Sequence, residues 1–210
     1  MRFVEVIALA ALGALAACAP KARPLAGTPS PERKLPDIQP PFGHRQIVFR
    51  WDYEENALIA RGEGALRYSA PDSARVDLFL NGGIRVGSAV LIDNALQSTN
   101  QSQIERFLPP PPMMWAAFGR LALPALPDTV LTVDGDVIHA DIGRPAAWRV
   151  TIKGNRIMQL ARLSSGRIVE IVTRDDGGRL LYEVPGRRKL WLGITRDEEV
   201  QPFNASIWSL

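Results

Sequence analysis

From residue 44 onward, apolar and polar residues alternate with a period of two, which is the period of a β-strand. The alternation is clearest in residues 47–53, 76–80, 150–152 and 190–194. In the C-terminal half, turn-forming residues recur roughly every 8 to 12 positions, a spacing typical of an antiparallel meander. Asp134-Gly135 is one of these turns, and its flanking residues predict a two-residue hairpin.

The strands predict a sheet that is antiparallel and strongly curved. No segment with helical periodicity is long enough to connect parallel strands. Residues 168–172 and 179–182 are apolar on both faces, so both faces are covered or one faces a cavity. We therefore expect residues 44–210 to form a mainly β (α+β) domain. Its sheet would be a curved antiparallel sheet or unclosed β-barrel of roughly 10–11 strands with a short helical lid.

Two segments interrupt the strand pattern. Ser102 and Glu105 have the spacing of a capping box, which predicts the start of a short helix. Four consecutive prolines then precede residues 113–123, which predict a helix of about three turns that ends before Pro124. This helix is apolar nearly all round, and Arg120 is its one charged residue. Such a helix is buried or contacts an apolar ligand.

The N-terminus has the features of a bacterial lipoprotein signal. Residues 6–15 form an apolar run of signal-peptide length, and a Leu-Ala-Ala sequence leads directly to Cys18. We expect residues 1–17 to be a cleaved signal peptide and Cys18 to carry the acyl chains, palmitate among them. An ordinary secretory signal or a buried core cysteine are the alternatives. Residues 18–43 contain many prolines and predict an extended tether between the lipid and the domain.

Composition excludes several other classes of protein. One cysteine in 210 residues excludes disulfide scaffolds and thiolate zinc sites. The net charge of +3 is small, and its basic residues are spread along the chain, so we expect no nucleic-acid partner. His44 and His139 lie in unlike contexts, and no motif of a known catalytic site is present. The sequence therefore predicts neither an enzyme nor a bound cofactor or metal.

The order of these features resembles the LolA/LolB superfamily of periplasmic lipoprotein carriers and receptors. The resemblance covers roughly residues 45–200 and rests on a strand at 59–66, a hairpin at 76–93, the apolar helix and the long meander. Within the superfamily it looks most like the outer-membrane receptor LolB. It implies an unclosed antiparallel barrel with helices at its mouth and an apolar interior that takes up acyl chains.

The resemblance also implies particular site residues. The helix would supply the acyl-binding side chains, which are Met113, Met114, Trp115, Phe118 and Leu121. LolB has an apolar residue in a Pro-Leu-Gly context on a protruding loop, and Ile84 is the best match for that membrane-inserting residue. The proline is missing here and Arg85 follows, so Val86 is the alternative match.

These features predict a monomeric lipoprotein anchored in the outer membrane, with its domain facing the periplasm. It would bind the acyl chains of lipoproteins or lipids, for their transfer or insertion, and a periplasmic carrier protein would be a partner. The alternative is an envelope lipoprotein that serves as a protein-binding or assembly module without lipid transfer. A hydrolase of the cell envelope is disfavoured, because no nucleophile and base are found together.

Overall fold

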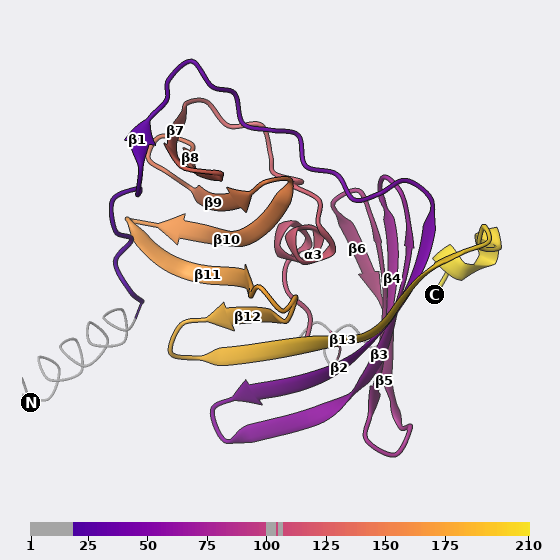
Figure 1. The fold of residues 1–210 in the computed structure, drawn as a ribbon. Helices are drawn as coiled ribbons and strands as arrows, with labels where there is room; N and C mark the ends of the chain where they lie inside the picture. Colours follow the sequence, from indigo (N-terminus) through magenta and orange to yellow (C-terminus); the bar gives the residue numbers. More distant parts are fainter. Residues whose placement is uncertain (1–18, 100–103, 105–106) are drawn as a thin grey trace, which may run out of the picture.

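The computed structural model describes residues 19–99, 104 and 107–210. Its strands form one antiparallel sheet in the order β1-β7-β8-β9-β10-β11-β12-β13-β2-β3-β4-β5-β6 (Figure 1). The strands are β1 (Thr28–Pro29), β2 (His44–Glu55), β3 (Leu58–Ser69), β4 (Ser73–Leu80), β5 (Arg85–Ile92), β6 (Ala95–Ser98), β7 (Thr129–Asp134), β8 (Val137–Ile142), β9 (Trp148–Lys153), β10 (Arg156–Ser164), β11 (Arg167–Arg174), β12 (Leu180–Val184) and β13 (Arg188–Val200).

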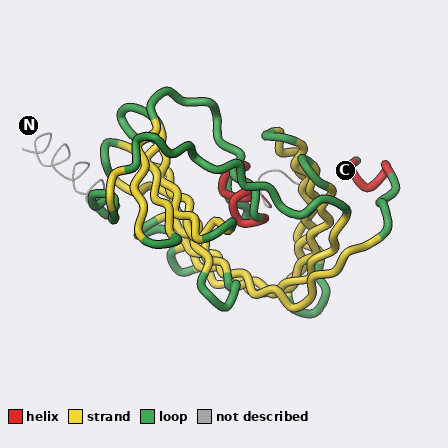
Figure 2. The backbone as a smooth tube through the Cα atoms, turned by 45° about the horizontal axis from the view of Figure 1, so that its top comes forward, coloured by secondary structure: helices red, strands yellow, loops and turns green. Residues whose placement is uncertain are grey.

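Two meanders make up this sheet. Strands β2 to β6 form one, β7 to β13 form the other, and the pairing of β13 with β2 joins them. The sheet curls strongly but does not close, because β1 and β6 form its two ends (Figures 1 and 2). The expected curved, unclosed antiparallel sheet is confirmed. It has more strands than expected because the two-residue β1 and the four-residue β6 add to its edges.

Helix α3 (Pro111–Phe118) lies on the concave side of the sheet (Figure 2). It begins with two prolines, which lack the N–H groups that a first helical turn leaves unpaired. The helix is shorter than expected because Gly119 adopts the left-handed conformation, with φ of 93°, and ends it. A 3-10 turn, η2 (Ala205–Trp208), follows β13. No helix of the described segments is long and apolar enough to cross a membrane.

The proline-rich stretch expected to be a tether lies along the sheet (Figure 1). The backbone of Ala22 donates to the carbonyl of Gly166, and that of Ile168 donates to the carbonyl of Pro20. Further along, β1 pairs with β7, and Ile38 is 1% exposed in the core. Prolines cannot donate, but their carbonyls still accept hydrogen bonds, which explains the packing. The signal peptide, Cys18 and most of the capping box at 102–105, which predicts the start of a short helix, lie outside the described residues. Ile104 is described and is helical.

The core lies on the concave side of the curl. Buried side chains from both meanders and from α3 form one cluster there. Cross-strand pairs of an aromatic residue and a glycine shape it: Trp51 lies opposite Gly62, and Phe49 lies opposite Gly64. A Cβ atom on Gly64 would meet the Phe49 ring at 2.3 Å, so the ring occupies the space that a side chain would need. The glycines thus let two large rings lie flat against the sheet.

Candidate functional site

A cavity of about 560 Å³ lies between the concave face of the sheet and α3. That volume is within the range of ligand-binding pockets. Its lining is largely apolar and comes from strands far apart in the sequence. The apolar lining residues are Ile47, Phe49, Trp51, Leu66, Val76, Leu78, Phe107, Leu108, Met114, Ala117, Phe118, Ile157, Leu180, Leu190, Leu192 and Ile194. A lining of this kind suits an apolar ligand, since it offers dispersion contacts and few directed polar groups.

Polar side chains gather at one end of the cavity. Arg45 of β2 and Asp197 of β13 form an ion pair of 2.7 Å, and both line the cavity. Arg174 of β11 donates to the carbonyl of Ala117 at 2.6 Å, which ties α3 to the sheet. Burial, together with the nearby charge of Arg156, lowers the pKa of Arg174 below its usual range. The cavity therefore has an apolar interior and a polar, charged mouth.

Two polar side chains, Tyr68 and Arg120, lie against Trp115 of α3. Tyr68 lines the cavity, and burial raises the pKa of its hydroxyl to about 12. The guanidinium of Arg120 lies 4.9 Å from the centroid of the Trp115 ring, a cation–π contact. Among the described residues, neither the Tyr68 hydroxyl nor the Nε and Nη1 atoms of Arg120 has a hydrogen-bond partner.

The structure divides the acyl-binding residues expected from the sequence. Met114 and Phe118 line the cavity. Met113 and Trp115 are fully buried in the core, and the Trp115 indole donates to the carbonyl of Asp93. Leu121 is half-buried against the same core, where its backbone donates to the carbonyl of Ile38. Residues 113, 115 and 121 thus hold α3 in place, while 114 and 118 face the cavity.

Most of the lining was not identified from the sequence. Leu190 lies in a strand whose alternation predicts an inward face, and Leu180 lies in a segment that is apolar on both faces. Both patterns also fit a solid core. A solid core and a cavity differ only in how tightly the sheet curls around α3. The pairing of β13 with β2, which joins the two meanders, connects segments distant in sequence, and no local pattern contains it.

The loop between β4 and β5 carries the residues expected to insert into a membrane. Ile84 is 65% exposed at its tip, next to Gly82 and Gly83, both of which have positive φ angles. Val86 is half-buried and packs against the core. Of the two matches weighed, Ile84 is therefore the side chain that protrudes into solvent.

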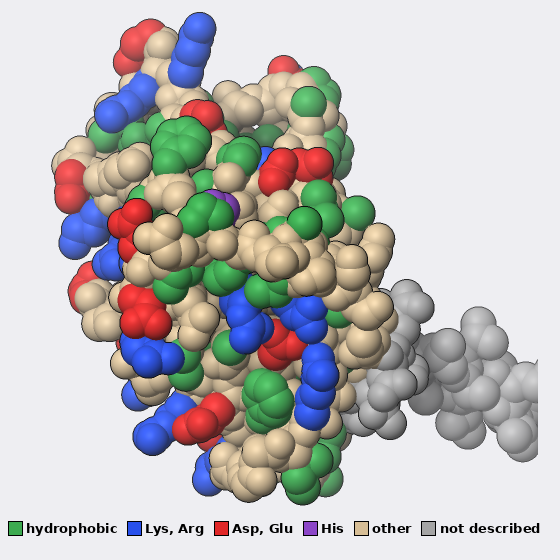
Figure 3. Space-filling view, turned by 90° about the vertical axis from the view of Figure 1, so that its right-hand side faces the viewer, with side chains coloured by type: hydrophobic (Ala, Val, Ile, Leu, Met, Phe, Trp, Pro, Cys, Tyr) green, Lys and Arg blue, Asp and Glu red, His purple; other side chains and the backbone are tan. Residues whose placement is uncertain are grey.

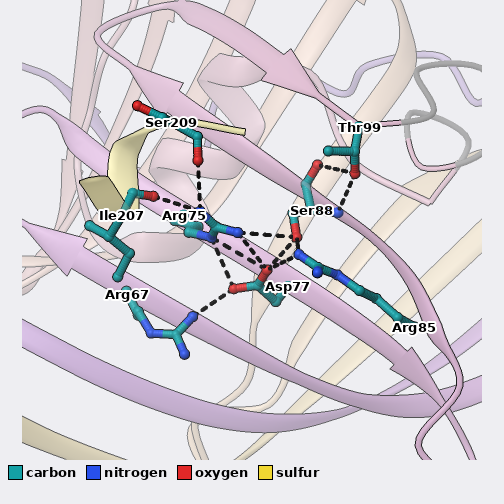
Figure 4. A network of polar contacts seen from close by, with 8 residues as sticks. All are labelled: Arg67, Arg75, Asp77, Arg85, Ser88, Thr99, Ile207 and Ser209. Atoms are coloured by element: carbon teal, nitrogen blue, oxygen red, sulfur yellow. Dashed lines mark hydrogen bonds and ion pairs between the residues drawn. The ribbon is translucent and has the colours of Figure 1, made fainter. Parts of the chain in front are cut away.

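A charged cluster on the outer face of β4 and β5 fixes this hairpin (Figure 4). The carboxylate of Asp77 lies 2.6 Å from Arg67, 3.2 Å from Arg75 and 3.3 Å from Arg85, and the Ser88 hydroxyl donates to it. Burial alone would raise the pKa of Asp77, but the hydrogen bonds from Ser88 and Arg75 and the neighbouring positive charges hold it below its ordinary value.

The same cluster binds the end of the chain. Arg75 Nη1 donates to the carbonyls of Ile207 and Ser209 at 2.7 and 3.0 Å (Figure 4). The segment that follows β13 is thereby held against β4. On the face shown in Figure 3, basic, acidic and hydrophobic side chains are interspersed. No group of acidic, histidine or cysteine side chains with the geometry of a metal site occurs in the described part of the chain.

These features define the class of structure: an open antiparallel half-barrel that encloses an apolar cavity under a short helix. The fold is that of LolA superfamily proteins. The crystal structure of one from Nitrosomonas europaea matches with a TM-score of 0.53 at 9% identity, over 82% of this chain and 92% of that one. A putative outer membrane lipoprotein-sorting protein domain from Vibrio parahaemolyticus also matches at 0.53, with 7% identity, over 81% and 91%. No family model and no curated sequence matches the chain.

Proposed function

We propose that this protein is a membrane-anchored lipoprotein whose half-barrel takes up the acyl chains of lipoproteins or lipids. The cavity of about 560 Å³ carries the proposal, because it is largely apolar, opens at a charged mouth and lies in a LolA-type fold. Acyl chains need a dry and adaptable lining rather than directed polar chemistry. Met114 and the aromatic rings of the lining provide such a surface. The role is binding and transfer, not catalysis.

The polar groups fit the rest of such a ligand. The buried Tyr68 hydroxyl would donate to an ester oxygen near the start of an acyl chain. Arg45, Arg156 and Arg174 at the mouth would lie against the polar part of the cargo, which stays in water. A soluble periplasmic carrier would deliver the cargo at this mouth, and the Ile84 loop would assist its release into the bilayer.

Lipidation of Cys18 would place the protein at the outer membrane, with its domain in the periplasm. The proposal rests on the Leu-Ala-Ala sequence that precedes Cys18 and on the position of this cysteine, the only one in the chain. Several acyl chains on one residue would hold the protein firmly, because each buried CH₂ contributes about 0.8 kcal/mol. The protein would act as a monomer, since one chain forms the whole cavity.

Displacement of a fluorescent fatty acid from the purified protein tests the cavity. Leu192 lines it, while the adjacent Trp191 points to the other face of β13 and lies over Lys189. We expect saturable binding that Leu192→Asp weakens by roughly tenfold or more, because the charge would lie among apolar groups. Trp191→Asp, the matched control, changes the same strand outside the cavity and should retain the wild-type affinity.

Absence of saturable binding, or equal losses in the two variants, would contradict the proposal. In the first case the protein-binding role becomes the better explanation. Circular dichroism and urea unfolding of both variants would separate a lost site from a lost fold.

A further inference from the structure

The antiparallel topology sorts the turns of the sheet into two rims. The pairing of β13 with β2 brings Arg188 opposite Glu55 at one end and Val200 opposite His44 at the other. One rim contains the turns β2–β3, β4–β5, β8–β9, β10–β11 and β12–β13. It runs along the left and lower side of the ribbon in Figure 1. We call it the anchor rim. The other five hairpin turns form the opposite rim.

The two rims differ in charge. The five turns of the anchor rim, each taken with its flanking strand residues, contain five arginines and a single glutamate. They are Arg85, Arg144, Arg167, Arg187, Arg188 and Glu55. The turns of the opposite rim carry more acidic than basic residues. These are Asp72, Asp93, Asp134, Asp136, Asp175 and Asp176, against Lys153, Arg156, Arg174 and Arg179.

Several arginines of the anchor rim reach solvent. Arg187 contacts Glu55 at 3.3 Å, yet its side chain is 70% exposed. Arg85 contacts Asp77 at 3.3 Å, and its side chain is 56% exposed. Acidic lipid headgroups attract such charges at a membrane surface.

Exposed apolar side chains occur on the same rim. Ile84 at the tip of the β4–β5 loop and Ile59 beside the β2–β3 turn are 65% and 64% exposed, and Leu58 is 37% exposed. Large apolar residues exposed among basic ones are typical of surfaces that enter the headgroup region of a bilayer.

The N-terminal segment is bound to this rim. The Arg167 guanidinium donates to the carbonyl of Ala19, and Lys21 forms a β-bridge with Arg167. From there the chain crosses the sheet, where Arg149 donates to the carbonyl of Arg23. Beyond Arg23 the segment stays bound, because β1 pairs with β7 and Ile38 is buried in the core. Ala19, the residue that follows Cys18 in the sequence, is thus held at the β10–β11 turn.

We propose that the anchor rim is a membrane-docking surface, and that the bound N-terminal segment fixes the orientation of the domain on an anionic lipid bilayer. The inference rests on the proposed lipidation of Cys18. Because Ala19 is held at the β10–β11 turn, acyl chains on the preceding Cys18 would attach the protein to the bilayer beside that turn. The basic turns and Ile84 then face the lipid. The charged mouth of the cavity comes from residues at the opposite rim, among them Arg45, Arg174 and Asp197, and so faces away from the membrane.

Depth-dependent fluorescence quenching tests this orientation. The mature protein, with acylation of Cys18 verified by mass spectrometry, is reconstituted into vesicles of phosphatidylethanolamine and phosphatidylglycerol. Cys18 is the only native cysteine, so a new cysteine is the only free thiol for an environment-sensitive label. Ala57→Cys labels the β2–β3 turn of the anchor rim, and Asn94→Cys labels the β5–β6 turn of the opposite rim; both positions are exposed.

We expect a quencher on the lipid chains to reduce the emission at position 57 severalfold more than at position 94. Equal or reversed quenching would overturn the inference, even if fatty-acid binding by the cavity is intact. Unmodified Cys18 in the mass spectrum would also overturn the inference, because the protein would then have no lipid anchor. Acyl-chain binding by the cavity would not be affected by that result.

Two further measurements test what fixes the orientation, namely the bound N-terminal segment and the basic turns. The Ala22 N–H donates to the carbonyl of Gly166, so Ala22→Pro should remove this hydrogen bond and loosen the N-terminal segment at the β10–β11 turn. The contrast between the two labels should then fall, and an unchanged contrast would contradict a role for the bound segment. In vesicles without phosphatidylglycerol the quenching at position 57 should weaken, whereas equal quenching would contradict a role for the basic turns.

Discussion

At the scale of single residues, two glycines of β3 make room for aromatic rings of the neighbouring strand β2. The segment Gly62-Glu63-Gly64 has two glycines in a strand, where glycine is normally unfavourable. The rings of Trp51 and Phe49 lie over these positions. The alternation of β2 predicted that both aromatic residues face inward. The need for glycine opposite them follows only from the register, which a single sequence does not contain.

Replacement of Gly64 by alanine should therefore destabilise the protein. The new methyl group would overlap the Phe49 ring, and we expect the free energy of unfolding to fall by about 1–3 kcal/mol. Urea denaturation monitored by tryptophan fluorescence measures the change. Gly193→Ala is the control, because a Cβ there meets no atom within 4 Å. A Gly64→Ala protein as stable as wild type would contradict this account of the packing.

Asp77 gives a second prediction, which depends on pH. Asp77→Asn leaves three arginines around a neutral amide, so at pH 7 it should cost about 3 kcal/mol of unfolding free energy. The pKa of Asp77 is depressed in the folded protein. The stabilisation by its carboxylate is therefore complete above the ordinary aspartate pKa of about 3.9 and is lost as pH falls below it.

The difference in stability between wild type and Asp77→Asn should accordingly be largest at neutral pH and shrink toward pH 3. Chemical denaturation at several pH values measures it. Asp136→Asn, in the exposed β7–β8 turn, controls for the loss of one negative charge and should change stability by less than about 0.5 kcal/mol. A difference that stays constant down to pH 3 would show that the Asp77 carboxylate does not stabilise the fold.

At the scale of elements, strands were more predictable than the helix and its surroundings. The alternation located the meander and the Asp134-Gly135 hairpin, which the structure confirms. The apolar run at 113–123 predicted α3, but the left-handed Gly119 ends it after Phe118. Only part of the helix then reaches the cavity. Which side it presents depends on the contacts of Trp115 with Asp93 and of Arg174 with Ala117, which join segments distant in sequence.

The end of α3 can be tested with Gly119→Ala. A Cβ at this position meets no atom within 4 Å, so the cost comes from the left-handed backbone alone. We expect a loss of about 1 kcal/mol in unfolding free energy. Asparagine tolerates this conformation better than alanine, so Gly119→Asn should lose less. If both variants matched wild type in a thermal melt, the left-handed conformation of Gly119 would not be what ends α3.

At the scale of the whole molecule, the sequence predicted an open, curved sheet and a membrane anchor at separate ends of a tether. The structure confirms the sheet and changes the description of the tether, because residues 19–29 lie along the domain. Hydrogen bonds from Arg149 and Arg167 to the tether backbone have no sequence signature. The cavity was expected from strands that are apolar on both faces and from the family resemblance, and its lining was expected only from residues 113–121.

The anchor itself is tested by Cys18→Ser. Without the thiol no thioether to lipid can form, so the protein should move from the membrane pellet to the soluble fraction of cell lysates. Immunoblotting of the two fractions measures the shift, and Ser30→Ala, in the bound N-terminal segment, serves as the control. Continued sedimentation of the Cys18→Ser protein with membranes would contradict lipidation as the means of attachment.

The open sheet has a mechanical consequence. In a closed barrel, strand number and shear together set the diameter, so the interior cannot widen without breaking hydrogen bonds. Here β1 and β6 are the two ends of the strand order, and within the described residues no strand pairing between them closes the sheet. The sheet can therefore bend. Bending would change the space under α3 while every strand pair stays intact. Cargo with chains of different length or number would then be accommodated by flexing one wall.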